Sequence, residues 1–201
     1  MVKKNRAPIL VVGQGYVGLP LAMAAVDAGF TVVGVDSDDV KISILSSGLS
    51  VVEDIPDDQV RLGLGAKLYK PTCSFPEAGN FSVAIITVPT PLKSGSPDLG
   101  FIEAATHSLA PLVTPGATVI LESTTYPGTT EELMVPILEQ GSGLRAGIDF
   151  YVGYSPERID PGNKRWSLLT TPKVVSGINS QSLARVRSFY EALGIEVVPV
   201  S

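Results

Sequence analysis

The sequence predicts an α/β fold built on a doubly wound, mostly parallel sheet. Three observations lead to this prediction: apolar runs of strand length alternate with helix-like segments, the runs are almost continuously apolar, and the first run ends in a glycine turn. Continuously apolar strands are typical of sheets that helices cover on both faces. Right-handed crossovers between parallel strands then produce a doubly wound sheet. We expect residues 1–201 to form a single domain.

Seven apolar runs are expected to form the strands. They are residues 8–12, 31–35, 82–88, 117–123, 149–154, 172–177 and 195–200. Residues 89–100, which are rich in Pro, Gly and Ser, are expected to form a surface loop that leaves the end of a strand.

Two of the intervening helices carry end signals. One helix is expected to begin at an aspartate cap, best placed at Asp38, and to end at Gly48. The other is expected to begin at Thr129, three residues before Glu132, which is the spacing of a capping box. Pro136 should kink this second helix because it has no N–H group to donate.

Composition argues against several classes of protein. The formal net charge is −5 with no basic stripe, which speaks against a nucleic-acid partner. No apolar run approaches the ~18 residues of a membrane span, and the run after the basic start is too short for a signal peptide. We therefore expect a soluble, cytoplasmic protein. The single cysteine, Cys73, and the single histidine, His107, argue against a disulfide, a metal site and a Ser-His-Asp triad, and His107 is expected on a helix surface.

Gly13, Gly15 and Gly18 form a G-x-G-x-x-G motif between the first strand run and a helix-like segment. In such a motif the first glycine allows a tight turn, the second lets the backbone approach a pyrophosphate, and the third lets helix and strand pack closely. The N–H groups and the positive dipole end of the helix then face the phosphates. A lone motif is weak, but the strand, turn and helix context indicates a dinucleotide site.

Asp36 ends the second strand run, about twenty residues after the motif. A carboxylate at that place accepts hydrogen bonds from both hydroxyls of the adenosine ribose. A 2′-phosphate would bring a second negative charge to about 4 Å, at a cost of roughly 1 to 4 kcal/mol. The sequence therefore favours NAD over NADP. Lys41, one turn into the next helix, is either within reach of the ribose or pyrophosphate or an ordinary solvated lysine.

Three later strand runs end in segments that combine hydroxyls or a carboxylate with prolines. They are residues 87–92, 122–130 and 154–163. Ligands of doubly wound sheets bind outside the carboxyl ends of the strands, so these segments are candidates for a site. Ordinary turn chemistry explains any one of them equally well.

Together with the glycine motif, these segments resemble the N-terminal domain of the UDP-glucose/GDP-mannose dehydrogenase family, especially its UDP-N-acetylglucosamine and UDP-N-acetylmannosamine 6-dehydrogenases. The resemblance covers nearly the whole chain and implies a Rossmann-like NAD-binding domain. It also implies oxidation of the C6 alcohol of a UDP-sugar, here a UDP-N-acetylhexosamine, to a carboxylate, with two NAD and a thioester intermediate. A homodimer is implied for the full-length enzyme.

The resemblance further implies which residues act. Around NAD it places Gly13, Gly15, Tyr16, Val17, Gly18, Asp36, Lys41, Pro89, Thr90 and Thr124. It makes Thr124 and Glu157 catalytic, with Thr124 holding a water and Glu157 assisting proton transfer or thioester hydrolysis. Glu157 and Arg158 are implied to contact substrate, although Arg158 could face a neighbouring domain instead.

The chain also departs from the family pattern. The nucleophilic cysteine of the family lies in a Gly-rich segment of a later domain, and Cys73 has no such glycines, so we expect Cys73 to be structural. Pro161 stands where some members carry a second acidic residue, and Asp160 is one place off. We therefore expect the chain to be the NAD-binding part of an enzyme, inactive alone, without the central helix and the UDP-sugar-binding domain.

Two other interpretations stay open. The chain could be the first domain of a 3-hydroxyacid or 6-phosphogluconate type dehydrogenase, although residues 123–132 and 155–163 speak against it. It could also be a stand-alone NAD-binding module that senses the cofactor without chemistry. The coding sequence after Ser201 would discriminate between the enzyme and the module.

Overall fold

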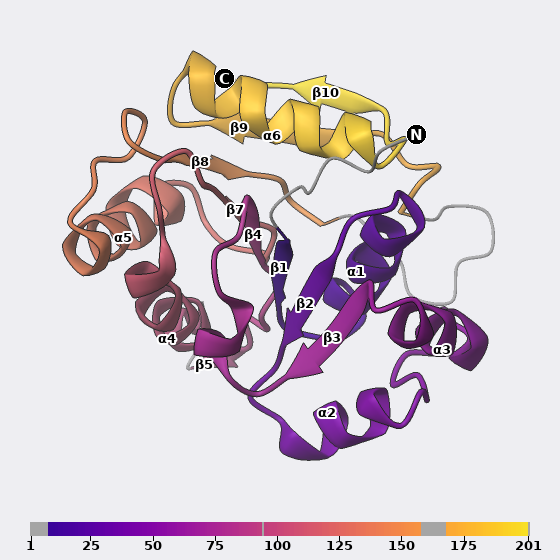
Figure 1. Ribbon diagram of the computed structural model, residues 1–201. Coiled ribbons are helices and arrows are strands. Elements are labelled where there is room, and N and C mark those ends of the chain that lie inside the picture. Colours follow the sequence, from indigo (N-terminus) through magenta and orange to yellow (C-terminus); the bar gives the residue numbers. More distant parts are fainter. Residues whose placement is uncertain (1–7, 94, 158–167, 201) are drawn as a thin grey trace.

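A computed structural model describes residues 8–93, 95–157 and 168–200. In this structure eight strands form one sheet in the order β10-β9-β8-β7-β4-β1-β2-β3 (Figure 1). Six of them are parallel neighbours, and their bounds are β1 Ile9–Val12, β2 Val32–Val35, β3 Tyr69–Thr72, β4 Val83–Ile86, β7 Thr118–Leu121 and β8 Tyr151–Tyr154. The strand order reverses direction between β1 and β4, which is where doubly wound sheets bind ligands.

Two further strands extend the sheet at one edge. Strand β9 (Lys173–Gly177) runs antiparallel to β8, and β10 (Val197–Pro199) runs parallel to β9. Helix α6 (Ser180–Ala192) joins β9 to β10 and lies beside them (Figure 1). The predicted doubly wound, mostly parallel sheet is therefore confirmed, with one antiparallel pairing at its edge.

Helices cover both faces of the sheet. Each strand contributes side chains to both faces, since successive strand residues point to opposite sides. In β1, Ile9 and Val11 face one cluster of buried side chains and Leu10 and Val12 face another. The first cluster includes residues of α6 and of α1 (Gly18–Asp27), α2 (Asp39–Ser46) and α3 (Asp57–Gly65). The second includes residues of α4 (Gly100–Leu109), α5 (Val135–Ser142) and the short helices η1 (Phe75–Ala78), η2 (Ala110–Leu112) and η3 (Thr129–Met134).

The expected helix ends are correct in one case and wrong in the other. Asp38 caps α2, since its side chain accepts a hydrogen bond from the Lys41 N–H. Thr129 forms no capping box with Glu132, because the Glu132 N–H donates to the carbonyl of left-handed Gly128 instead. Pro136 lies in the first turn of α5, directly after a wide π-helical stretch, η3.

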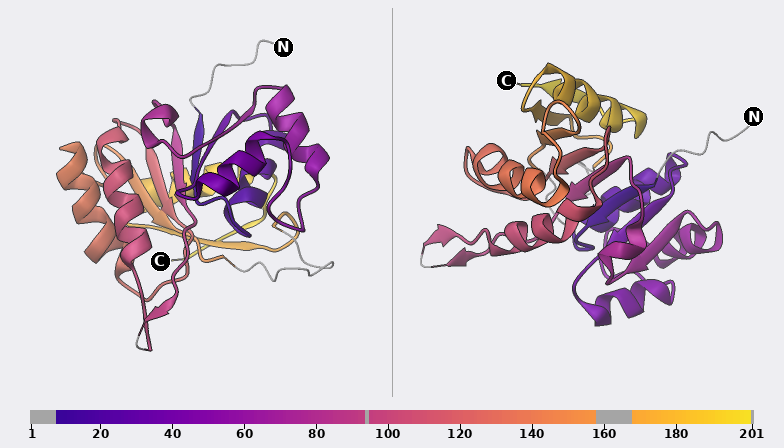
Figure 2. Two further views of the ribbon diagram at one scale, coloured as in Figure 1. Left: turned by 90° about the horizontal axis from the view of Figure 1, so that it is seen from below. Right: turned by 60° about the vertical axis from the view of Figure 1, so that its left-hand side comes forward.

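Three strands were missing from the strand prediction. Strand β3 pairs with β2 although its sequence, YKPT, is not an apolar run. Within the expected loop at residues 89–100, strands β5 (Leu92–Lys93) and β6 (Ser96–Pro97) form a small antiparallel hairpin. This hairpin projects from the body of the molecule (Figure 2).

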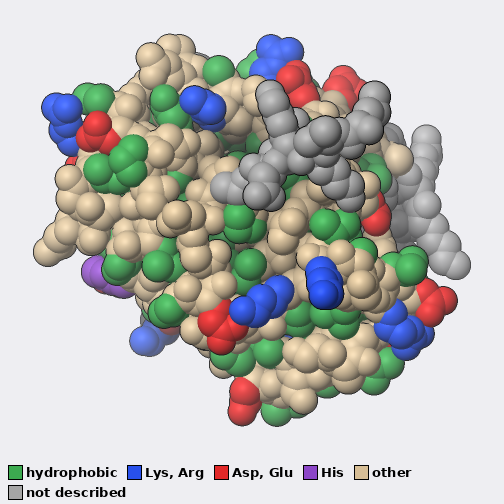
Figure 3. All heavy atoms as spheres, in the orientation of Figure 1, with side chains coloured by type: hydrophobic (Ala, Val, Ile, Leu, Met, Phe, Trp, Pro, Cys, Tyr) green, Lys and Arg blue, Asp and Glu red, His purple; other side chains and the backbone are tan. Residues whose placement is uncertain are grey.

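The surface carries charges of both signs. On the face drawn in Figure 3, Lys and Arg side chains are spaced apart among acidic and apolar ones rather than gathered in a stripe. His107 lies exposed on α4, as expected. None of the helices in the described residues combines the length and the apolar character that crossing a membrane requires.

Candidate functional site

A pocket of about 590 Å³ opens at the switch point of the sheet, beside the carboxyl ends of β1, β2, β4 and β7. Its volume lies in the range typical of small-molecule and cofactor sites. Almost every residue expected to bind a cofactor or to act in catalysis lines it, namely Gly13, Gly15, Tyr16, Val17, Asp36, Lys41, Pro89, Thr90, Thr124 and Glu157. Arg158, Asp160 and Pro161 lie outside the described residues.

The glycine turn has the geometry that its sequence requires. Gly13 has φ +95°, and a Cβ atom there would lie 2.7 Å from the Thr87 carbonyl oxygen. A Cβ atom on Gly18 would lie 1.8 Å from the Gly13 carbonyl oxygen, so Gly18 packs beneath the turn. Gly15 differs from both, because a Cβ atom there would meet nothing within 4 Å. Gly15 therefore leaves open space at the pocket wall rather than relieving an internal clash.

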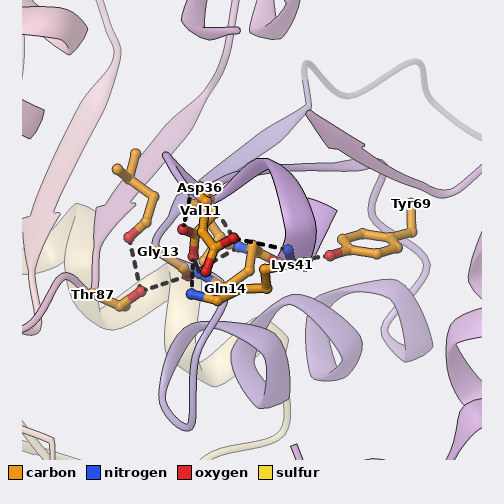
Figure 4. A network of polar contacts seen from close by, with 9 residues as sticks. Val11, Gly13, Gln14, Asp36, Lys41, Tyr69 and Thr87 are labelled. Atoms are coloured by element: carbon orange, nitrogen blue, oxygen red, sulfur yellow. Dashed lines mark hydrogen bonds and ion pairs between the residues drawn. The ribbon is translucent and has the colours of Figure 1, made fainter. Parts of the chain in front are cut away.

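Asp36 is fixed by three hydrogen bonds at the pocket edge (Figure 4). Its Oδ2 accepts from the Gln14 N–H and from Lys41 Nζ, both at 2.7 Å, and its Oδ1 accepts from the Asp38 N–H at 3.0 Å. Burial would raise the pKa of Asp36, but these donors outweigh burial and the pKa lies below its usual value. Asp36 is thus an ionised acceptor, and Lys41 is its ion-pair partner rather than a solvated lysine.

Gln14 is a site residue that the sequence reasoning missed. Its fully buried side chain donates to the carbonyls of Val11 and Gly13 and accepts from the Tyr69 hydroxyl at 2.7 Å (Figure 4). Gly34 makes room for it, because a Cβ atom there would lie 2.5 Å from Gln14 Oε1. Gln14, which stands between the first two glycines of the motif, therefore joins the glycine turn and Asp36 in one hydrogen-bond network.

A second polar cluster reaches the pocket through Glu122 and Glu157, which both line it. Lys173 Nζ lies 2.8 Å from Glu157 Oε2 and 3.2 Å from Glu122 Oε1, and the Tyr190 hydroxyl also donates to Glu122 Oε1. Glu122 and Tyr190 are fully buried, and the side chain of Lys173 is 4% exposed. Glu157 was expected at the site, Glu122 begins the candidate segment 122–130 but was given no role, and Lys173 was not predicted.

Cys73 is exposed and is not part of the core. Its slight burial and the carboxylates of Asp39, Asp36 and Asp38 raise the pKa of its thiol, which is the opposite of what a nucleophile needs. No group of three or more metal-ligating side chains occurs in the part of the chain that the structure describes.

Comparison with known proteins decides the family. The sequence profile described as the UDP-glucose/GDP-mannose dehydrogenase family, NAD binding domain, matches residues 7–194. The chain belongs to this family. The resemblance drawn from the motifs is therefore confirmed.

Curated relatives agree with this placement. The chain is 40% identical over 188 residues to the UDP-N-acetyl-D-glucosamine 6-dehydrogenase of Pseudomonas aeruginosa, across 92% of this chain and 43% of the relative. It is 36% identical over 185 residues to the UDP-N-acetyl-D-mannosamine dehydrogenase of Pyrococcus horikoshii, across 92% of this chain and 44% of the relative. The chain thus spans less than half the length of these relatives.

Solved structures of family members share the fold. The UDP-D-ManNAc dehydrogenase of Pyrococcus horikoshii has a TM-score of 0.90 at 34% identity, over 96% of this chain and 47% of that one. A GDP-mannose dehydrogenase of Pseudomonas aeruginosa in a ternary complex has a TM-score of 0.87 at 28% identity, over 96% of this chain and 46% of that one.

The cofactor of this domain is NAD, and the residues of the pocket fit it. The open space at Gly15 lies just before the start of α1, and the N–H groups at the start of a helix favour phosphate. Asp36 presents an ionised acceptor directly after β2, the position at which doubly wound dinucleotide-binding sheets in general carry the carboxylate for the ribose. Asp36 and Glu157 both line this one pocket.

Proposed function

We propose that this chain is the NAD-binding part of a nucleotide-sugar 6-dehydrogenase that oxidises the C6 alcohol of a UDP-N-acetylhexosamine to a carboxylate. The observation that carries the proposal is one pocket that joins the glycine turn and Asp36 to Thr124 and Glu157. The names of the two curated relatives support the substrate class. NAD supplies the hydride acceptor when it is bound.

In this proposal one group of residues binds the cofactor and another takes part in the chemistry. The turn at Gly13, Gly15 and Gly18, with Tyr16, Val17, Asp36, Lys41, Pro89 and Thr90, binds and orients the cofactor. Thr124 holds a water at the pocket, and Glu157 accepts a proton from it during hydrolysis of an acyl intermediate. The relatives are more than twice as long as this chain, so we assign the nucleophile and the sugar-binding residues to the part of such enzymes that has no counterpart here.

We extend the proposal to partners, place and organisation. Residues 1–201 act as one dinucleotide-binding domain, the longer enzyme works as a homodimer in the cytoplasm, and nucleic acid is not a partner. Arg158 remains a proposed substrate contact. Other dehydrogenase types are less favoured: a glycerol-3-phosphate dehydrogenase shares the fold at a TM-score of 0.68 but only 14% identity, so it supports the architecture alone.

Cofactor choice gives the first test. NAD should bind this chain tenfold to a thousandfold more tightly than NADP, because a 2′-phosphate beside Asp36 costs roughly 1 to 4 kcal/mol. Lys41 offsets part of that repulsion, since its Nζ lies 2.7 Å from the Asp36 carboxylate. Lys41→Met should therefore weaken NADP binding more than NAD binding, as measured by titration calorimetry.

The control for this test is Lys70→Met, which removes an exposed lysine that pairs with Glu77 away from the pocket. It should change neither affinity. Equal affinity of the parent chain for the two cofactors would show that Asp36 does not contact the ribose.

The glycine turn gives a second test. Gly15→Ala should weaken NAD binding at least tenfold, about 1.4 kcal/mol, while leaving thermal stability nearly unchanged, because the added methyl group occupies only the open space at the pocket wall. Gly18→Ala should instead destabilise the fold, since its Cβ atom would lie 1.8 Å from a backbone oxygen. Calorimetry and thermal unfolding of both variants separate the two effects. Parent-like NAD affinity in Gly15→Ala would show that the phosphates do not bind at this turn.

A further inference from the structure

The peptide that joins Gly13 to Gln14 is held at both of its ends. The carbonyl oxygen of Gly13 and the N–H of Gln14 belong to one planar unit and point in opposite directions. The oxygen accepts hydrogen bonds from Thr87 Oγ1 and Gln14 Nε2, both at 3.0 Å, and the N–H donates to Asp36 Oδ2 at 2.7 Å (Figure 4). Because glycine restrains the backbone less than any other residue, the bonds at the oxygen end help to aim the N–H at Asp36.

The side chain of Gln14 acts on this peptide from outside the pocket. It is fully buried and does not line the pocket, whereas Gly13 and Gly15 on either side of it do. Its amide nitrogen donates to the carbonyls of Val11 and Gly13, so both N–H groups of the amide are used. Its amide oxygen accepts from the Tyr69 hydroxyl at 2.7 Å. Tyr69 therefore fixes which way the amide of Gln14 turns.

Strands β2 and β3 are shaped for this contact. A Cβ atom on Gly34 of β2 would lie 2.5 Å from Gln14 Oε1 and 2.9 Å from Tyr69 Cε2, so a larger residue there would displace both side chains. Tyr69 begins β3 and is buried. Burial and the charge of Asp36 raise the pKa of its hydroxyl, so the phenol keeps its proton and acts as the donor to Gln14.

Resting on the proposed contact between Asp36 and the adenosine ribose, we propose that Gln14 and Tyr69 are positioning residues that set the preference of this pocket for NAD over NADP. The Gln14 amide holds the Gly13 carbonyl, and the shared peptide then directs its N–H to Asp36 and fixes the direction of that carboxylate. A fixed carboxylate accepts from both ribose hydroxyls of NAD and repels a 2′-phosphate. A carboxylate that turns away loses part of both effects.

Lys41 acts on the same oxygen of Asp36 but restrains it less. Its Nζ donates to Asp36 Oδ2 at 2.7 Å from a partly exposed side chain on a flexible four-carbon stem. The Gln14 N–H belongs to a buried backbone turn. The other charged or titratable groups near Asp36 include Asp38 and Asp39 on the side of α2 and Tyr69 and Cys73 on the side of β3. None of the substitutions proposed below changes a formal charge.

Tyr69→Phe tests the proposal on the 201-residue chain, because it removes only the hydroxyl that holds Gln14. NAD affinity should fall by about threefold to tenfold, which is the effect of one hydrogen bond. NADP affinity should fall less, because NADP has no free 2′-hydroxyl to lose and the repulsion of its phosphate is relaxed. The preference for NAD should therefore narrow. Titration calorimetry below the unfolding temperature of each variant measures both affinities.

The titration of Asp36 provides a second readout on the same samples. Burial raises the pKa of Asp36, and its donors Lys41, Gln14 and Asp38 lower it. When the Gln14 N–H is no longer aimed at the carboxylate, the midpoint of Asp36 should rise by about 0.5 to 1 pH unit. Carbon NMR of chain labelled with ¹³C at the aspartate carboxyl groups follows this midpoint. A hydroxyl that only stabilises the fold would change neither the midpoint nor the preference.

Gln14→Met tests the same link from the other side, since it removes the amide and keeps the length of the side chain. It should narrow the preference at least as much as Tyr69→Phe, and Tyr69→Phe should add nothing to it, because the hydroxyl then has no amide to hold. If Gln14→Met does not fold, Gly34→Ala replaces it, because the added Cβ atom displaces Gln14 Oε1.

The matched control is Ser182→Ala, which removes a buried hydroxyl on α6 that accepts from the Val152 N–H and does not line the pocket. It should lower thermal stability but leave both affinities and the midpoint of Asp36 unchanged. This result would show that loss of a buried hydroxyl is not enough to change cofactor choice.

Failure of this proposal and failure of the proposed function give different results. Equal weakening of NAD and NADP binding in Tyr69→Phe, or an unchanged Asp36 midpoint, overturns the positioning role while NAD binding by the parent chain still supports the proposed function. Equal affinity of the parent chain for the two cofactors, with a midpoint that still rises in Tyr69→Phe, has another meaning. It would show that the network holds Asp36 but that Asp36 does not contact the ribose, which overturns the selectivity.

Discussion

Glu157→Gln in a dehydrogenase that carries this chain is expected to slow hydrolysis of the acyl intermediate by about 10²- to 10⁴-fold. The substitution keeps the shape of the side chain and its hydrogen-bonding reach to Lys173 but removes the group that accepts a proton at the pocket. The first oxidation should suffer less, so an acyl-enzyme should accumulate. Intact-protein mass spectrometry detects that adduct, and stopped-flow absorbance separates the first oxidation from the hydrolysis.

The matched control is Glu77→Gln, because Glu77 is also a lysine-paired carboxylate but lies exposed and outside the pocket. It should hydrolyse the intermediate at the parent rate. A Glu157→Gln enzyme that turns over at the parent rate with no trapped adduct would make Glu157 a scaffold residue whose task is to neutralise Lys173.

The free energy of unfolding of the chain is expected to fall by roughly 2 to 3 kcal/mol as the pH rises from 5 to 7. The pKa of Glu122 is about 7 in the folded chain against 4.5 for the ordinary group, since burial disfavours its charge. Between these two values the folded state binds a proton that the unfolded state has released. The contribution of Glu122 to stability is therefore greatest below pH 4.5, and this contribution is lost as the pH rises through 7.

Glu122→Gln isolates this contribution, because glutamine resembles the protonated acid at every pH. The variant should lose the slope between pH 5 and 7 and exceed the stability of the parent chain at pH 8, as measured by urea unfolding at each pH. Asp36 contributes with the opposite sign and at lower pH, since its pKa is depressed and its contribution is lost only on acidification below about 4. A parent chain with equal stability at pH 5 and pH 7 would contradict the buried, neutral state of Glu122.

The sequence predicts the half of the site that is built from local signals. The glycine turn, Asp36 and the Asp38 cap each depend on neighbours within one strand, turn or helix, and the structure has them as expected. Strand β3 gives no such signal, because its YKPT sequence becomes a strand only through pairing with β2. The capping box at Thr129 fails for a local reason, because the carbonyl of the preceding, left-handed Gly128 accepts the hydrogen bond from the Glu132 N–H.

The Glu122, Lys173 and Glu157 cluster could not be predicted in the same way. Its members lie at the ends of three strands, and their contact depends on β9 pairing antiparallel to β8 at the edge of an otherwise parallel sheet. A charged residue at the boundary of an apolar run, such as Lys173 before VVSG, is the only local signal. Charged residues are also common at solvent-exposed strand ends. Only the register between β8 and β9 shows that Lys173 lies beside Glu157.

The antiparallel placement of β9 also imposes an order on how the site forms during synthesis. Chains are made from the N-terminus at about 5–20 residues per second, so Glu122 and Glu157 leave the ribosome before Lys173, which follows Glu157 by sixteen residues. For roughly one to three seconds the two carboxylates lack the ammonium that pairs with them in the finished fold. The glycine turn with Asp36 and Lys41 has been complete in the nascent chain since well before then. The cofactor half of the pocket is therefore able to form first, and the acid–base half becomes competent only when the last strand pair and α6 dock against the sheet.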